Sequence, residues 1–137
     1  MEPAKQLTRL CEKYGINILY AFGSRGQAAA RFILSGEAMP PSGSDLDIGV
    51  LPRNPLSVKE KVQLALDLET LFDISRVDLV VLPEADPFLA ANIIRGERLY
   101  ANDSYLADEY DLYILRRAGD LAPLERERME LILRKNL

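Results

Sequence analysis

Three short, mostly apolar segments, each ended by a glycine or a proline, constrain the fold of this chain most strongly. They span residues 16–22, 45–51 and 77–82 and end at Gly23, Pro52 and Pro83. Apolar runs of this length that stop at a chain-breaking residue are typical of buried β-strands. The sequence therefore predicts a small sheet. The third segment is apolar except for Asp78, so we expect it to be a central, buried strand.

Helical patterns separate these strands. Apolar residues recur at helical spacing across residues 3–14, and shorter helices are expected at 27–34 and 87–94. Ser57 and Glu60 match a capping box at the start of another helix. This order of elements predicts an α/β (α+β) domain, a small sheet with flanking helices and a C-terminal helical tail.

The remaining segments are expected to be a loop, an edge strand and two helices. Residues 35–44 are rich in glycine, proline and serine, which favours a loop. Residues 98–101 suggest an edge strand, and 104–117 a helix. Gly119 to Pro123 interrupts the helical pattern, so we expect a break before a final charged helix at 123–135. The apolar residues of that final helix are Leu124, Met129, Leu131, Ile132 and Leu133.

A chain of 137 residues is long enough for one hydrophobic core and short for two. We expect residues 1–101 to form the domain. Residues 102–137 are expected to form a tail that packs on the domain or on a partner.

Two absences narrow the chemistry that the chain can perform. It contains no histidine and a single cysteine, Cys11. Histidine-based acid–base catalysis, Ser-His-Asp and Cys-His nucleophiles, a conventional zinc site and an internal disulfide are therefore excluded. Carboxylates, hydroxyls, lysine, arginine and a bound hard cation remain.

Charge and hydropathy indicate the surroundings in which the chain works. The net charge of −4 and the pI near 4.9 argue against nucleic-acid binding as a function, because backbone contacts need clustered positive charge. No apolar run approaches the roughly 18 residues of a membrane-spanning helix, and the first residues lack a signal-peptide pattern. We therefore expect a cytoplasmic protein with no membrane association.

Three aspartates interrupt the apolar strands. Asp45 and Asp47 are two residues apart on one strand, so their side chains should share a face about 6.6 Å apart. Asp78, on a neighbouring strand, completes a triangle. Three carboxylates this close repel one another unless a cation compensates them, and Mg²⁺ prefers such oxygen ligands.

A less specific interpretation of these aspartates stays open. Ten Asp in 137 residues give about 0.7 chance pairs at this spacing, so the pair alone is not informative. Asp45 and Asp47 could merely cap a strand or face water, and Asp78 could pair with Arg76 or Arg98.

The turn after the first strand suits phosphate. Gly23 lets the backbone approach a phosphate closely, and the N–H groups of residues 24–26 begin a helix, where anions bind. Ser24 adds a hydroxyl, and the guanidinium groups of Arg25 and Arg31 match the geometry of phosphate oxygens.

Taken together, Gly23-Ser24, then Ser44-Asp45-Leu46-Asp47, then Asp78 within an apolar strand resemble the minimal nucleotidyltransferases of the polymerase-β superfamily. The resemblance covers about residues 15–101. It implies a short mixed sheet with flanking helices.

The resemblance also implies a site and a reaction. Asp45, Asp47 and Asp78 are expected to be catalytic and to bind Mg²⁺, two ions in the full site. Gly23, Ser24, Arg25 and Ser44 are expected to bind the nucleotide. Members of this size resemble antitoxins, some of which transfer AMP from ATP to a hydroxyl of a helical HEPN-type toxin. One departure is the 20 residues (25–44) between Gly-Ser and the first Asp, where the family pattern has about ten.

Two alternatives stay open. The chain could be a non-catalytic binding module that neutralises a partner through the apolar residues of its tail helix. It could also be a small-molecule nucleotidyltransferase, a class in which a larger second lobe accompanies this domain, and a homo-oligomer could supply that lobe.

Overall fold

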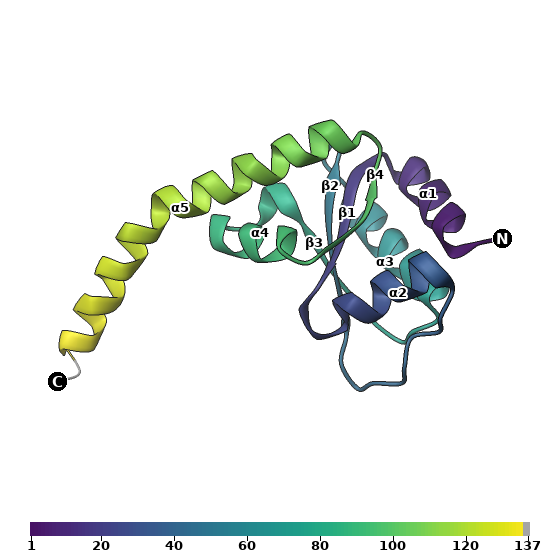
Figure 1. The fold of residues 1–137 in the computed structure, drawn as a ribbon, viewed down its shortest axis with the longest axis horizontal. Helices are drawn as coiled ribbons and strands as arrows, with labels where there is room; N and C mark the ends of the chain where they lie inside the picture. Colours follow the sequence, from purple (N-terminus) through teal and green to yellow (C-terminus); the bar gives the residue numbers. More distant parts are fainter. Residues whose placement is uncertain (136–137) are drawn as a thin grey trace.

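A computed structural model describes residues 1–135 and shows a four-stranded sheet with helices on both faces (Figure 1). In chain order the elements are α1 (Pro3–Tyr14), β1 (Ile16–Phe22), η1 (Gly23–Arg25), α2 (Gly26–Ser35), β2 (Leu46–Pro52), α3 (Val58–Phe72), β3 (Val77–Val81), η2 (Leu82–Glu84), α4 (Pro87–Ile94), β4 (Glu97–Ala101) and α5 (Ser104–Lys135). Five side chains of α5 are not described, those of residues 121, 122, 124, 125 and 135. The expectation for Leu124 therefore lies outside the described residues.

The sheet is mixed, as the resemblance implied. Its strand order is β3-β2-β1-β4. β1 pairs antiparallel with both β2 and β4, whereas β2 and β3 run parallel. The parallel pair brings the N-terminal ends of β2 and β3 to the same end of the sheet, next to the C-terminal end of β1.

The expectation that the third strand is central was wrong, because β3 lies at the edge of the sheet. Val77 and Val81 are buried against the helices on one face, while Asp78 is exposed. Helical cover on both faces gives an edge strand the apolar run that a central strand would have. The apolar pattern therefore reports cover by helices and not position in the sheet.

The two faces of the sheet carry separate cores. Alternate residues of β1, among them Leu19 and Ala21, face the core beneath α1, α2 and α3. Ile18, Tyr20 and Phe22 face the second core, beneath α4 and α5. The expected capping box is confirmed, since Ser57 and Glu60 bond each other's backbone N–H at the start of α3.

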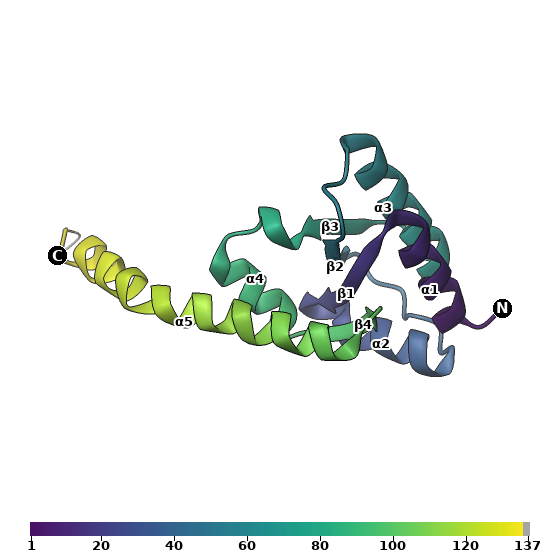
Figure 2. The ribbon, with the colours of Figure 1, turned by 90° about the horizontal axis from the view of Figure 1, so that it is seen from above.

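The expected break in the C-terminal helix was also wrong. α5 is continuous from Ser104 to Lys135 and includes Pro123. A glycine within a helix costs about 1 kcal/mol relative to alanine, and a proline removes one backbone hydrogen bond, so neither must end a helix. Figure 2 shows the first half of α5 lying along the body and the second half projecting beyond it.

A polar network fixes the first half of α5 on the sheet. The hydroxyl of Tyr20, a fully buried side chain on β1, donates a short hydrogen bond to Asp111. Arg98 on β4 binds Asp108 at 2.8 Å and Asp111 at 3.4 Å. Burial and the bond to Asp111 raise the pKa of Tyr20 above its ordinary value, so the phenol stays protonated and keeps donating.

Within residues 1–135, no helix combines the length and the apolar composition that crossing a membrane requires.

Close packing of α4 on the sheet depends on Gly49. A Cβ built at this position would collide with the side chain of Ile93 on α4. Gly43, in the loop before β2, has open space around it and no left-handed backbone. We therefore expect Gly49→Ala to lower the free energy of unfolding by about 1–3 kcal/mol, the cost of overpacking a core. Gly43→Ala should leave it within about 0.5 kcal/mol in the same urea titration. Equal stabilities of the two variants would contradict this packing.

Candidate functional site

Two of the three aspartates are brought together by the register of β2 and β3. Asp47 and Asp78 are directly paired residues of the two parallel strands. On its other side, Asp47 is paired with Phe22, the last residue of β1. Both carboxylates lie on the sheet face that carries α4 and α5, since Ile48 and Leu79, the residues beside them, face the opposite core.

Asp45 is placed differently. It precedes β2, and its carboxylate lies 3.6 Å from the Nε of Arg76, whose side chain is 76% exposed while that of Asp45 is 40% exposed. Within the described part of the chain, no three His, Cys, Asp or Glu side chains are gathered closely enough to hold a metal ion. The structure thus shows a pair of carboxylates, with the third turned toward a surface arginine. Exposed ion pairs contribute about 0–1 kcal/mol, so little holds Asp45 in that position.

Asp78 does not form the ion pair with Arg76 or Arg98 that the less specific interpretation of the sequence allowed. Arg98 binds Asp108 and Asp111 on α5, and Arg76 meets Asp45. None of the ion pairs between described residues includes Asp78. Asp78 is therefore exposed beside Asp47 without a basic partner.

Asp47 carries the electrostatic cost of this arrangement. Burial raises its pKa above the ordinary value of 3.8, and the negative charges of Asp78 and Asp45 raise it further. A raised pKa means that the ionised form is disfavoured where it stands. A cation between Asp47 and Asp78 would reverse both effects, so the donor set fits a hard cation such as Mg²⁺.

The turn after β1 lies against Asp47. Gly23 has a left-handed backbone, with φ at +71°, and a Cβ at this position would overlap the Asp47 carboxylate. The chain continues through the single turn η1 into α2, with Ser24 exposed. The glycine that the sequence singled out for phosphate is thus also the residue that lets the turn approach a carboxylate.

Arg25 points away from solvent and into the protein. Its side chain is buried, with only 8% of the residue exposed. Its guanidinium donates to the backbone carbonyl oxygens of Pro40, at 2.8 Å, and Ser44, at 3.2 Å. Arg25 therefore ties the loop between α2 and β2 to the turn after β1. The sequence could not reveal this role, because any residue has a backbone carbonyl.

Ser44 lies at the end of that loop, next to Asp45. Its side chain is exposed, and its backbone N–H donates to the Ser42 hydroxyl. A cavity of about 340 Å³ opens between the loop and α2 and is lined by Ser24, Arg25 and Ser44 among others. Three of the four residues expected to bind nucleotide thus line one cavity.

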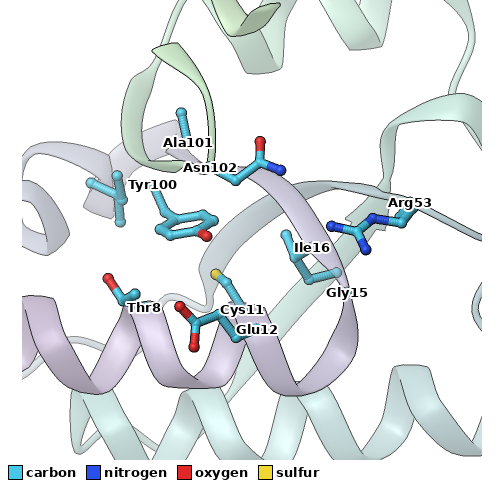
Figure 3. Close-up of a pocket in the computed structure, with 10 residues that line it drawn as sticks. Thr8, Cys11, Glu12, Gly15, Ile16, Arg53, Tyr100, Ala101 and Asn102 are labelled. Atoms are coloured by element: carbon cyan, nitrogen blue, oxygen red, sulfur yellow. The ribbon is translucent and has the colours of Figure 1, made fainter.

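A larger cavity, of about 680 Å³, lies at the opposite end of the sheet (Figure 3). Tyr100, Arg53 and Glu12 line it, together with Cys11 of α1. Burial raises the pKa of the Cys11 thiol, and Glu12 adds to the shift, so this thiol stays protonated. None of the residues expected to be catalytic lines this cavity, which is therefore separate from the carboxylate pair.

Comparison with known proteins decides the family. The sequence profile described as polymerase beta, nucleotidyltransferase matches residues 5–105. The chain belongs to this family. Among curated proteins, no sequence match is found.

Solved structures share the nucleotidyltransferase fold along nearly the whole chain. A crystal structure of a toxin–antitoxin complex with AMP-PNP contains a chain 21% identical, with a TM-score of 0.72, covering 95% of this chain and 98% of that one. A mutant MntA–HepT complex contains a chain 20% identical, with a TM-score of 0.70 and coverage of 95% and 98%. The complex of a tri-AMPylated HEPN toxin from Shewanella oneidensis with its MNT antitoxin contains one 20% identical, with a TM-score of 0.69, covering 96% of both chains.

The contact between Gly23 and Asp47 can be tested against a second left-handed glycine. Gly36 has a similar backbone, with φ at +77°, but open space around it. Gly36→Ala should cost about 1 kcal/mol of unfolding free energy, from backbone strain alone. Gly23→Ala should cost at least about 1 kcal/mol more, because its methyl group must displace the carboxylate. Equal losses in urea denaturation would show that the turn does not contact Asp47.

The raised pKa of Asp47 has a consequence for stability. Because its pKa in the folded state exceeds its unfolded value, ionised Asp47 destabilises the fold at neutral pH, and the penalty disappears below about pH 4, where both states are protonated. Asp47→Asn should therefore raise the free energy of unfolding at pH 7 by roughly 0.5 kcal/mol, the order of a like-charge pair between strands. Asp103→Asn is the control, because Asp103 follows β4 and caps the start of α5, away from Asp47. Asparagine caps a helix as well as aspartate does, so this change should leave stability unaltered. Loss of stability in Asp47→Asn would contradict the assigned repulsion.

Proposed function

We propose that this chain is a Mg²⁺-dependent nucleotidyltransferase that transfers AMP from ATP to a hydroxyl group of a partner protein, a HEPN-type toxin that it neutralises. The observation that carries the proposal is the in-register pair of Asp47 and Asp78 beside the Gly23 turn. Two carboxylates at the end of a sheet, next to a turn that admits phosphate, are the parts that phosphoryl transfer requires.

Mg²⁺ fits the residues present. Asp47 and Asp78 would hold it, and Asp45 would join them by leaving its exposed contact with Arg76. The bound ion supplies positive charge that neutralises the triphosphate and the leaving pyrophosphate. The raised pKa of Asp47 supports this assignment, since a residue that is costly when ionised alone is suited to share a cation.

The chain's own groups position the reactants. The backbone of Gly23 and Ser24 receives the phosphates, and Ser24 and Ser44 line the same cavity. The acceptor oxygen attacks the α-phosphorus of ATP, the new P–O bond forms, and the bond to the β-phosphate oxygen breaks, so pyrophosphate leaves. Asp78, exposed and in no ion pair with a described residue, takes the acceptor's proton, since the chain has no histidine to do so.

The similar structures support the choice of reactants. One contains AMP-PNP, and another contains a toxin that carries AMP groups. A third carries two aspartates, two positions apart, changed to glutamate, which is the spacing of Asp45 and Asp47 here. These facts concern other proteins of about one-fifth identity, so donor, acceptor and partner are proposals for this chain.

A second candidate function is neutralisation by contact alone. α5 exposes large apolar side chains, more than a soluble helix needs, among them Leu112, Leu115, Met129 and Leu133. A helix that projects from the body with such a surface is suited to bind a partner protein. Contact and transfer need not exclude each other, but they make different predictions for the carboxylates.

Substitution of the paired carboxylates tests catalysis. The chain is incubated with α-labelled ATP, Mg²⁺ and the product of the adjacent gene, and label on each protein is measured. Asp47→Asn and Asp78→Asn should each lower transfer by at least about 100-fold, because each removes a charge from the reacting centre. Asp103→Asn, which makes the same change of charge outside the site, should retain transfer.

The same variants separate the two functions in a toxicity assay. If neutralisation requires transfer, Asp47→Asn and Asp78→Asn should fail to protect cells that express the partner, while Asp103→Asn protects them. Full protection by the two site variants would favour contact alone. Transfer retained by either of them would refute the assigned site.

A further inference from the structure

The cavity between α2 and the 36–45 loop has an unusual charge for this acidic chain. Its polar lining consists of Ser24, Arg25, Gln27, Arg31, Ser42 and Ser44, and the rest is alanine and proline. Two cationic side chains and no carboxylate line it, although the whole chain has a net charge of −4. The lining therefore favours an anionic occupant.

Two residues that line the cavity are direct chain neighbours of residues at the candidate site. Ser24 follows Gly23, whose turn contacts Asp47, and Ser44 precedes Asp45. A ligand that spans both places must carry several negative charges at one end and share a cation with carboxylates at the other. A polyphosphate chain has this pattern of charge.

The two arginines stand in different situations. Arg25 is buried, and its guanidinium donates hydrogen bonds to two backbone carbonyls four residues apart in the loop. The side chain of Arg31 is 57% exposed, and its one ion pair with a described residue is with Glu37, itself 67% exposed, at 3.9 Å. An exposed contact of this length contributes little, so the Arg31 guanidinium is available to a ligand.

The position of Arg31 on α2 directs it toward the cavity. Gln27 and Arg31 are four residues apart and so share one face of the helix, and both line the cavity. The opposite wall is the loop that Arg25 holds, which runs beneath α2 in Figure 1. The helix thus supplies one wall with an exposed cation, and the tethered loop supplies the other.

We infer that Arg25 and Arg31 have different roles in binding the nucleotide. Arg31 contacts the polyphosphate end of the donor directly, whereas Arg25 is a positioning residue that holds the loop as the facing wall. The inference deepens the proposed function and rests on it for the identity of the donor. It differs from the expectation drawn from the sequence, in which Arg25 itself contacts the nucleotide.

Charge and shape separate the two roles experimentally. At a direct phosphate contact, lysine can replace arginine as a point charge, but it cannot span two carbonyls with a rigid fork. Arg31→Lys should therefore bind inorganic tripolyphosphate within about threefold of the wild type, and Arg31→Gln should bind it about tenfold more weakly. Arg25→Lys should weaken binding although it keeps the charge. Arg9→Gln, an exposed change of the same charge on α1, should have no effect.

The experiment is calorimetric titration of the full chain with tripolyphosphate in Mg²⁺ buffer, together with hydrogen exchange of residues 36–45. Exchange in this loop should accelerate in Arg25→Lys and stay unchanged in both Arg31 variants. Wild-type affinity in Arg31→Gln, or no binding by the wild-type chain, would overturn the inference. Wild-type affinity and loop protection in Arg25→Lys would overturn the role of Arg25.

Two features keep the test decisive. Arg31 is exposed, so its variants should fold even if Arg25→Lys does not, and the Arg31 measurements alone can refute the inference. Tripolyphosphate binding also needs no transfer. If no label transfer is detected but Arg31→Gln loses affinity, the proposed function fails, with the nucleotide as donor, while the contact between Arg31 and polyphosphate stands.

Discussion

The candidate site depends on one structural constraint, the parallel register between β2 and β3. This register sets Asp47 directly beside Asp78, so two like charges meet at the end of a sheet that is otherwise apolar on both faces. A shift of one residue would turn one of them to the opposite face. The turn at Gly23, at the end of β1, also approaches Asp47 closely. This approach is possible only because Gly23 has no Cβ.

Much of this arrangement could be predicted from the sequence, because the signals were local. Strands bounded by glycine and proline, the capping box of Ser57 and Glu60, and the spacing of Asp45 and Asp47 all depend on neighbouring residues. The edge position of β3 was missed, since helices cover an edge strand as they cover a central one. The continuity of α5 was missed because Gly119 and Pro123 weaken a helix without having to end it.

The parts of the site that escaped prediction involve groups that sequence patterns do not encode. Arg25 binds backbone carbonyls that any loop residue would offer. Asp45 turns toward Arg76, although its spacing from Asp47 suggested that the two would act together. Family resemblance predicts which residues form the site, but the contacts of each depend on burial and on distances between elements far apart in the chain.

The solitary thiol has a practical consequence for experiments on this protein. Cys11 is fully buried and protonated, and it has no second cysteine with which to form a disulfide. A cysteine placed on the solvent-facing side of α5 would therefore be the only reactive thiol on the folded chain. Fluorophores or spin labels could be attached there without removing the natural residue, so the position of the projecting helix relative to the sheet becomes directly measurable.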